Sequence, residues 1–426
     1  MLAFSDNELV CFFLYCRRNG GDVWPDQHST AGLVFCNLLL LLATAVFFIF
    51  GSTLIDLPHI TSTFPTYLNA NVTDWITFFP ERNNTFFSER KKLKTLFPER
   101  YGKPIKMLYW SSLWYDTIDW KFQSLIDNGC PELRSKCRFT ADRRQYNDSD
   151  VVLFHMRSGY EFPKYRLRFQ KWVFAIAESP VHTYRSLSRE RWLYNITMTY
   201  KRASDVTFLY GECRRKNTNP ATSHVQYNYA VGKKHLVAWF VSNCNTPSRR
   251  EVYVAEMAKY IDVHKFGCGG GYSCPRTKHT YCDTVLLNST YKFYLSFENS
   301  LCTEYITEKL YRVLNLNVVP IVLGYSKYSE FLPPHSFIDV RDFDSPKTLA
   351  AYLEMLSKND AEYNRYFAWK QTHTCTPLPA LNTACKLCRY VQRRRQRRQV
   401  ADVLQFWSRN TNCVNAKQFY HGAISV

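Results

Sequence analysis

The chain has 426 residues and lacks charge over one long stretch near its start. Residues 27–55 contain no Asp, Glu, Lys or Arg, and within them Ala31 to Phe50 is almost wholly apolar. Roughly 20 apolar residues are enough to cross the hydrocarbon core of a bilayer. The stretch also lacks a clear small-x-small cleavage site, which favours an anchor over a removed signal peptide. We therefore predict a transmembrane signal-anchor helix over 31–54, with a buried core helix as the alternative.

Lysine and arginine are also missing beyond this stretch, and none appears until Arg82. Arg17 and Arg18 lie on its N-terminal side. Positive residues mark the cytosolic flank of a membrane span, so residues 1–30 are expected to be a cytoplasmic tail. The rest of the chain is then expected on the lumenal or extracellular side.

Acidic residues are scarce: 36 stand against 55 Lys and Arg, for a net charge of +19. Nucleic acid, an anionic membrane or a phosphorylated small molecule could each attract such a charge. The basic run RYVQRRRQRR at 389–398 would suggest nucleic-acid binding in a cytosolic protein. In a lumenal protein it is better read as a solvated helix face or a contact with acidic glycans or membrane, so we expect no nucleic-acid partner.

Only three of the 15 cysteines lie in the predicted tail or span, and the other 12 lie at or after Cys130. An even number in an oxidising compartment predicts disulfides. The C-x-x-C at 385–388 and the cluster Cys268, Cys274 and Cys282 also offer zinc or redox spacings, which the lumenal setting disfavours. Five Asn-x-Ser/Thr sequons agree with this topology, at Asn71, Asn83, Asn147, Asn195 and Asn288.

The chain shows no internal repeat, but its texture changes along its length. Residues 55–104 have poor periodicity and indicate a stem. After them, short apolar strands alternate with helices, which is typical of an α/β fold with parallel sheets. We expect two Rossmann-like lobes with a cleft between them. Their ranges are 105–230 and 231–400, and 401–426 is a C-terminal extension.

The segment YKFYLSFENSLCTEYITEKLYRVLNLNVVPIVLG at 291–324 predicts a strand, a polar loop, a helix and a second strand. With Thr303 as N-cap, the spacing puts four polar residues on one helix face: Tyr305, Glu308, Lys309 and Arg312. Asn299 lies in the preceding loop, at the sheet edge where open α/β folds bind ligands. A lysine there can reach a diphosphate, and a carboxylate can accept hydrogen bonds from ribose. The alternative is an exposed helix with ordinary ion pairs.

The same segment, with FENSLCTEYITEKL followed by VVPIVLG, resembles the signature of the α1,3-fucosyltransferases. The likeness continues, in order, in segments spread over roughly residues 106–390: WVFAIAESPVHT, NITMTYKRASDV, VAWFVSNCNTPSRREVYV, FIDVRDFDSPKTLAAYL and YFAWK. The resemblance implies an inverting enzyme of the GT-B fold that uses GDP-fucose. It also implies a single-pass type II protein of the Golgi membrane with a lumenal catalytic domain.

Carried over residue by residue, the resemblance implies that Glu178 is the general base for the acceptor hydroxyl. It implies that Arg249 and Lys309 bind the donor diphosphate, and that Asn299, Tyr305 and Glu308 belong to the donor site. Two cations can offset the charge of a departing pyrophosphate without an obligatory metal. We therefore expect no metal ligands, although a divalent cation could stimulate the enzyme. The family's C-terminal C-x-x-C is disulfide-bonded, and Cys130 and Cys137 are candidate mates for it here.

The chain departs from the family pattern at two places. Tyr311 to Leu314 replace the usual run after Thr-Glu-Lys, and Ala203 stands where Asp is common. Ala203 puts in doubt how the loop beneath the acceptor site is held, while Asp205 remains as a structural residue. The expected reaction adds L-fucose to O3 of a GlcNAc on a glycoprotein N-glycan, first the core GlcNAc and second an antennal one. The alternative is a catalytically weak, glycan-binding homologue.

Overall fold

The computed structural model describes residues 102–111, 118–183, 186–217, 227–274, 281–378, 381–393, 402–409 and 413–424. The predicted cytoplasmic tail and membrane span, most of the predicted stem, the first two sequons and half of the basic run lie outside these residues. Within the described residues, no helix has the length and apolarity that a membrane span requires.

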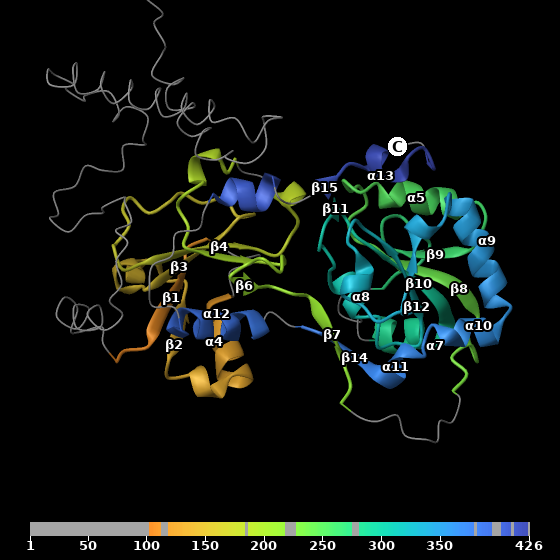
Figure 1. Cartoon of the computed structure of the whole chain (residues 1–426), viewed down its shortest axis with the longest axis horizontal. Coiled ribbons are helices and arrows are strands. Elements are labelled where there is room, and N and C mark those ends of the chain that lie inside the picture. The colour runs from red at the N-terminus through yellow and green to blue at the C-terminus, as the bar shows by residue number, and fades with distance from the viewer. Residues whose placement is uncertain are drawn as a thin grey trace, which may run out of the picture. The chain divides into compact units, whose positions relative to one another are not determined.

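Two parallel sheets organise the described chain (Figure 1). The first has the order β2 (Cys137–Thr140), β1 (Ile105–Tyr109), β3 (Val151–His155), β4 (Lys171–Ile176), β5 (Ile196–Thr199) and β6 (Val206–Thr207). The second has the order β13 (Ile338–Asp339), β12 (Val319–Leu323), β10 (Tyr291–Phe297), β8 (His235–Phe240) and β9 (Val263–Phe266). All pairings within the two sheets are parallel, which confirms the α/β prediction.

The two sheets share one strand order. Numbered along the chain, the second sheet runs 2-1-3-4-5, and the first adds a sixth strand to the same order. Their central strands are mostly apolar and buried along their length, as expected where both faces are covered. All five residues of β3 and all seven of β10 are buried. In this topology the strand order reverses between the first and third strands, so a ligand is expected beyond the carboxyl ends of β8 and β10.

Helices and shorter strand pairs complete the fold. The α-helices are α4 (Ile118–Gly129), α5 (Arg250–Met257), α7 (Asn288–Thr290), α8 (Glu308–Tyr311), α9 (Pro346–Ser357), α10 (Asp360–Arg365), α11 (Trp369–Thr372), α12 (Leu381–Arg393) and α13 (Ala416–Tyr420). Two antiparallel pairs join β7 (Gly211–Arg215) to β14 (His373–Pro377), and β11 (Leu301–Cys302) to β15 (Cys413–Val414).

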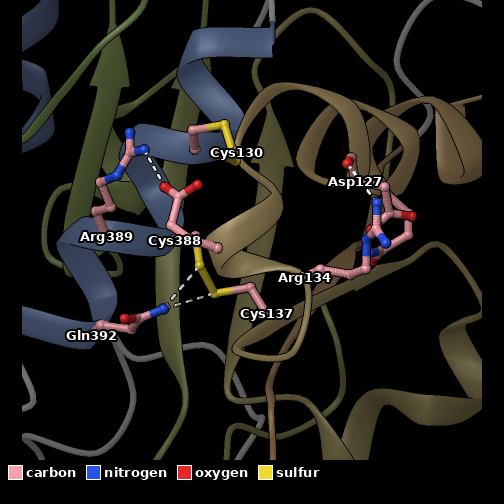
Figure 2. The surroundings of a disulfide bond; sticks show 10 residues. Asp127, Cys130, Arg134, Cys137, Cys388, Arg389 and Gln392 are labelled. Atoms are coloured by element: carbon pink, nitrogen blue, oxygen red, sulfur yellow. Dashed lines mark hydrogen bonds and ion pairs between the residues drawn. A yellow bond between two sulfur atoms is a disulfide. The ribbon is translucent and has the colours of Figure 1, made fainter.

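Helix α12 falls in the range assigned from the sequence to the second lobe, yet it packs beside α4 and β6 of the first sheet (Figure 1). Two disulfides fix it there, Cys130–Cys385 and Cys137–Cys388. Figure 2 shows the second of these, with Gln392 directing its amide toward both sulfurs. The predicted mates of the C-terminal C-x-x-C are therefore confirmed, and their connectivity is defined.

The other eight cysteines of the predicted lumenal part also pair. Their disulfides are Cys213–Cys375, Cys244–Cys268, Cys274–Cys282 and Cys302–Cys413. Each of the 12 cysteines from Cys130 onward is thus committed to a disulfide, as the even count predicted. The zinc alternative for the C-x-x-C and the cysteine cluster is wrong, because their thiolates are already used.

Candidate active site

The helix of the 291–324 segment begins later than its sequence predicts. Its N-cap is Thr307, and α8 spans only Glu308–Tyr311. Glu304 has φ = 61°, a left-handed conformation that interrupts any helix starting at Thr303. The predicted shared face is therefore wrong for Tyr305, which precedes the helix and is buried.

A buried carboxylate explains why Thr307 is the N-cap of α8. Glu298, at the carboxyl end of β10, is 1% exposed and accepts hydrogen bonds from the Thr307 backbone N–H at 2.8 Å and from its hydroxyl at 2.9 Å. These contacts fix the residue before the first helical turn. Burial raises the pKa of the Glu298 carboxyl, and the Lys309 ammonium opposes this rise.

Lys309 lies within a small ionic cluster. Its Nζ is 3.3 Å from Glu298 Oε2, 3.2 Å from Glu308 Oε1 and 2.8 Å from the Thr307 hydroxyl. Burial alone would lower the pKa of Lys309, but the two carboxylates outweigh burial and raise that pKa. Because Glu308 is 57% exposed and Lys309 is 24% exposed, both side chains can reach a ligand.

The loop that carries Arg249 is bonded to the end of β10. Ser248 donates its backbone N–H to the Asn299 carbonyl at 3.1 Å and its hydroxyl to the Glu298 carbonyl at 2.7 Å. Arg249 follows, with φ = 51° at the N-cap position of α5, and its side chain is exposed. Arg250 instead turns inward, donating to the Phe297 carbonyl at 2.5 Å. Arg249 and Asn299 are therefore presented at the edge where a ligand is expected.

Glu178 follows β4 in the first sheet and is held by three neighbours. Tyr305 donates its hydroxyl to Glu178 Oε2 at 2.8 Å, and Arg157 Nη1 is 3.1 Å from Oε1. His182 Nδ1 is 3.9 Å from Oε2. Burial lowers the pKa of His182, although Glu178 acts in the opposite direction. The predicted base is thus 20% exposed and fixed through both oxygens.

A second contact joins the loops that carry Glu178 and Asn299. Ser179 donates its hydroxyl to Ser300 Oγ at 2.9 Å, and both hydroxyls lie 3.1 Å from His182 Nδ1. All three side chains are buried. The structure therefore brings the predicted base into contact with one predicted donor-site residue, Tyr305. The bond between Ser179 and Ser300 also brings the base close to a second one, Asn299, which precedes Ser300.

The loop with Ala203 is held without an Asp at that position. Asp205 accepts hydrogen bonds from the backbone N–H and hydroxyl of Thr197, both at 3.0 Å, and from the Tyr390 hydroxyl at 2.7 Å. Arg202 donates its backbone N–H to Glu304 at 2.7 Å and pairs with Glu330. Asp205 thus has the structural role expected of it, and the loop is tied to the segment beside Tyr305.

The sequence reasoning missed Arg157, His182 and Glu298. Two of them carried a usable signal, since Glu298 directly follows β10 and Arg157 lies just beyond β3, where parallel strands end. His182 offered none, because its role depends on contacts with Ser179 and Ser300.

Family models now identify the chain. One described as "Fucosyltransferase, N-terminal" matches residues 102–211, and one described as "Glycosyltransferase family 10 (fucosyltransferase) C-term" matches 230–407. The chain belongs to glycosyltransferase family 10, the fucosyltransferases. The family assignment made from the sequence motifs is confirmed, and the two matches cover the first and the second sheet.

Named members of this fucosyltransferase family are similar over most of the described chain. The "4-galactosyl-N-acetylglucosaminide 3-alpha-L-fucosyltransferase 9" of Bos taurus is 38% identical over 282 residues, which are 64% of this chain and 75% of that protein. The "4-galactosyl-N-acetylglucosaminide 3-alpha-L-fucosyltransferase FUT6" of Homo sapiens is 36% identical over 305 residues, or 68% of this chain and 81% of that protein. A solved structure titled "Crystal Structure of alpha1,3-Fucosyltransferase with GDP" is 18% identical, with a TM-score of 0.45, covering 69% of this chain and 91% of its own.

Proposed function

We propose that this fucosyltransferase transfers L-fucose from GDP-fucose to O3 of a GlcNAc residue on a glycoprotein glycan. One observation carries the proposal. The Tyr305 hydroxyl, four residues before Lys309, donates to Glu178 Oε2 at 2.8 Å. A carboxylate able to accept a proton is thereby bonded to the short segment that also carries a lysine able to bind a diphosphate.

The reaction assigns one role to each end of this arrangement. Lys309 and Arg249 bind the donor diphosphate and offset the charge that grows on it as the bond from fucose C1 to the phosphate oxygen breaks. Glu178 accepts the proton from the acceptor O3 as the new bond from O3 to C1 forms. GDP leaves on the face opposite to attack, so the β-linked donor gives an α-linked product. Asn299, Tyr305 and Glu308 line the donor side.

The proposal also specifies which GlcNAc of the glycan accepts the fucose. The N-glycan core GlcNAc remains our first prediction and an antennal GlcNAc the second. The names of the two relatives, which specify a 4-galactosyl-N-acetylglucosaminide, support the second. A panel that contains both acceptors separates these predictions.

The cellular setting belongs to the same proposal. The uncharged stretch at 27–55 supports a signal anchor over 31–54, a lumenal catalytic domain and a place in the Golgi membrane. The two parallel sheets support a GT-B arrangement with the donor lobe following the acceptor lobe. Stimulation by a divalent cation remains a prediction.

The test uses the full-length chain purified in detergent, with GDP-fucose and two acceptors: an N-glycan with an exposed core and an N-acetyllactosamine chain. We expect fucose on O3 of one GlcNAc type, established by linkage analysis of the product. Glu178→Gln should reduce kcat by about 10²–10⁴-fold. The matched control is Glu354→Gln, on an exposed turn of α9, which should keep the wild-type rate. Failure of the wild type to turn over GDP-fucose with any acceptor would favour the glycan-binding alternative, and a Glu178→Gln variant of wild-type rate would refute the mechanism.

A further inference from the structure

A second cluster of ligand-type side chains lies at the other end of the second sheet. His235 is the first residue of β8, Asp262 directly precedes β9, and His264 is the second residue of β9. One ligand atom from each lies within 4.8 Å of the other two. The three side chains range from buried, for His264, to exposed, for Asp262.

From this geometry we propose that His235, Asp262 and His264 form a Zn²⁺ site. Two imidazole nitrogens and one carboxylate oxygen suit zinc, whereas magnesium and calcium prefer oxygen ligands alone. Water would supply the fourth ligand on the exposed side, where Asp262 is 68% exposed.

His264 is oriented for this role by a buried neighbour. Its Nδ1 is 2.7 Å from the hydroxyl of Tyr291, which is 2% exposed. When Nδ1–H donates to that hydroxyl, Nε2 keeps the lone pair that a metal ion needs. The ion then replaces the proton that Nε2 would otherwise donate to Asp262 Oδ2, 2.9 Å away. A cation placed beside these two electron-rich atoms satisfies both. A partner on the second ring nitrogen that fixes tautomer and ring direction is typical of zinc-bound histidines.

The other neighbours leave the site accessible. The Tyr272 hydroxyl is 3.0 Å from His264 Nε2 and competes with an ion for the same lone pair. Tyr272 is 44% exposed, so water can replace this hydrogen bond when the hydroxyl moves away. The His235 ring lies 4.4 Å from the His264 ring, centroid to centroid, and within the described chain neither of its nitrogens has a hydrogen-bond partner.

The position of the cluster predicts what the ion would do. Arg249 and Asn299 follow the carboxyl ends of β8 and β10, whereas the cluster lies at the amino ends of β8 and β9. A six-residue parallel strand spans roughly 20 Å, so the ion would not contact the donor. It would instead join β9, the edge strand of the second sheet, to β8. The proposed site therefore stabilises the fold and takes no part in sugar transfer.

The experiment titrates Zn²⁺ into the chelator-treated full-length chain in detergent, by calorimetry, and repeats the titration with Mg²⁺. We expect one Zn²⁺ per chain, no Mg²⁺ bound at this site, and a rise in Tm of a few degrees at saturating zinc (about 2–6 °C). His235→Ala and Asp262→Asn should each raise the Kd for zinc at least tenfold. The control His373→Ala, on β14 and outside the cluster, should leave the Kd unchanged.

Two tyrosine variants test the assigned geometry separately from folding. Tyr291→Phe removes the partner of Nδ1 and should weaken zinc binding by about 10–100-fold. Tyr272→Phe removes the competing hydroxyl and should leave binding equal or tighter. The proposal is overturned if no stoichiometric zinc binds, or if His235→Ala and Asp262→Asn bind zinc as the wild type does. Because every readout is zinc affinity or Tm, the result is independent of whether the chain transfers fucose.

Discussion

Tyr305 donates its hydroxyl to Glu178 Oε2 over 2.8 Å, although 127 residues separate the two in the chain. This hydrogen bond joins the first sheet to the segment before α8. Sequence resemblance places Tyr305 in the donor site, whereas the structure places its hydroxyl on the predicted base. The two roles make different kinetic predictions.

Tyr305→Phe keeps the ring, which packs 5.1 Å from the Tyr200 ring, and removes only the hydroxyl. If the hydroxyl positions Glu178, kcat should fall about tenfold while the KM for GDP-fucose stays near the wild-type value. Steady-state kinetics with each substrate varied in turn measure both. A rise in the KM for GDP-fucose at unchanged kcat would assign Tyr305 to donor binding instead.

Lys309→Ala should reduce stability as well as donor binding. It leaves the Glu298 carboxylate buried without its cation, a change that costs about 3–5 kcal/mol in buried ion pairs. The double variant Lys309→Ala with Glu298→Gln removes the unpaired carboxylate of Glu298. It should recover much of the unfolding free energy, but not the activity. Denaturant unfolding and transfer assays measure the two effects. Equal stability of the single and double variants would show that burial of the Glu298 carboxylate does not require the Lys309 ammonium.

His155 should make stability depend on pH. Burial lowers the pKa of His155 to about 4, and Arg157 adds to this shift. As the pH falls below about 6.5, His155 becomes protonated in the unfolded chain but stays neutral in the folded chain. The free energy of unfolding therefore decreases. The loss should reach about 3 kcal/mol at pH 4 and then level off. Unfolding free energies measured between pH 7 and 4 should show a smaller decline for His155→Gln than for the wild type, and parallel curves would contradict the assignment.

The described sequons differ in accessibility. Asn147 is exposed, whereas Asn195 is 2% exposed and its Oδ1 accepts a hydrogen bond from the Trp172 backbone N–H at 2.9 Å. Use of Asn195 as a glycosylation site, which its sequon suggested, therefore conflicts with the fold. Peptide mass spectrometry of the protein from secretory cells should find a glycan at Asn147 and none at Asn195. Absence of glycan from both, as well as from Asn288, would count against the lumenal topology.

Strand and helix positions that depend on local pattern were predictable. The mostly apolar runs of β3, β4, β8 and β10 stand out in the sequence, as does the helical spacing of α9. The two-residue β6 and the four-residue β2, β5 and β9 are too short to stand out in this way. The start of α8 was misplaced by four residues, because the carboxylate of Glu298 selects Thr307 over Thr303 as the N-cap. Such a choice is made by a side chain outside the helix, and no local pattern records it.

The sequence by itself determined the family, the parallel α/β design and the residue types of the chemistry. Those features are written in contiguous motifs, such as the 291–324 segment, and in the hydrophobic period of each strand. Only the tertiary structure decided that Tyr305 meets Glu178, that Glu298 holds Lys309, and that α12 belongs with the first sheet. The physical reason is that each of these depends on a contact between distant segments, where burial and hydrogen-bond geometry select one partner among many chemically equivalent residues.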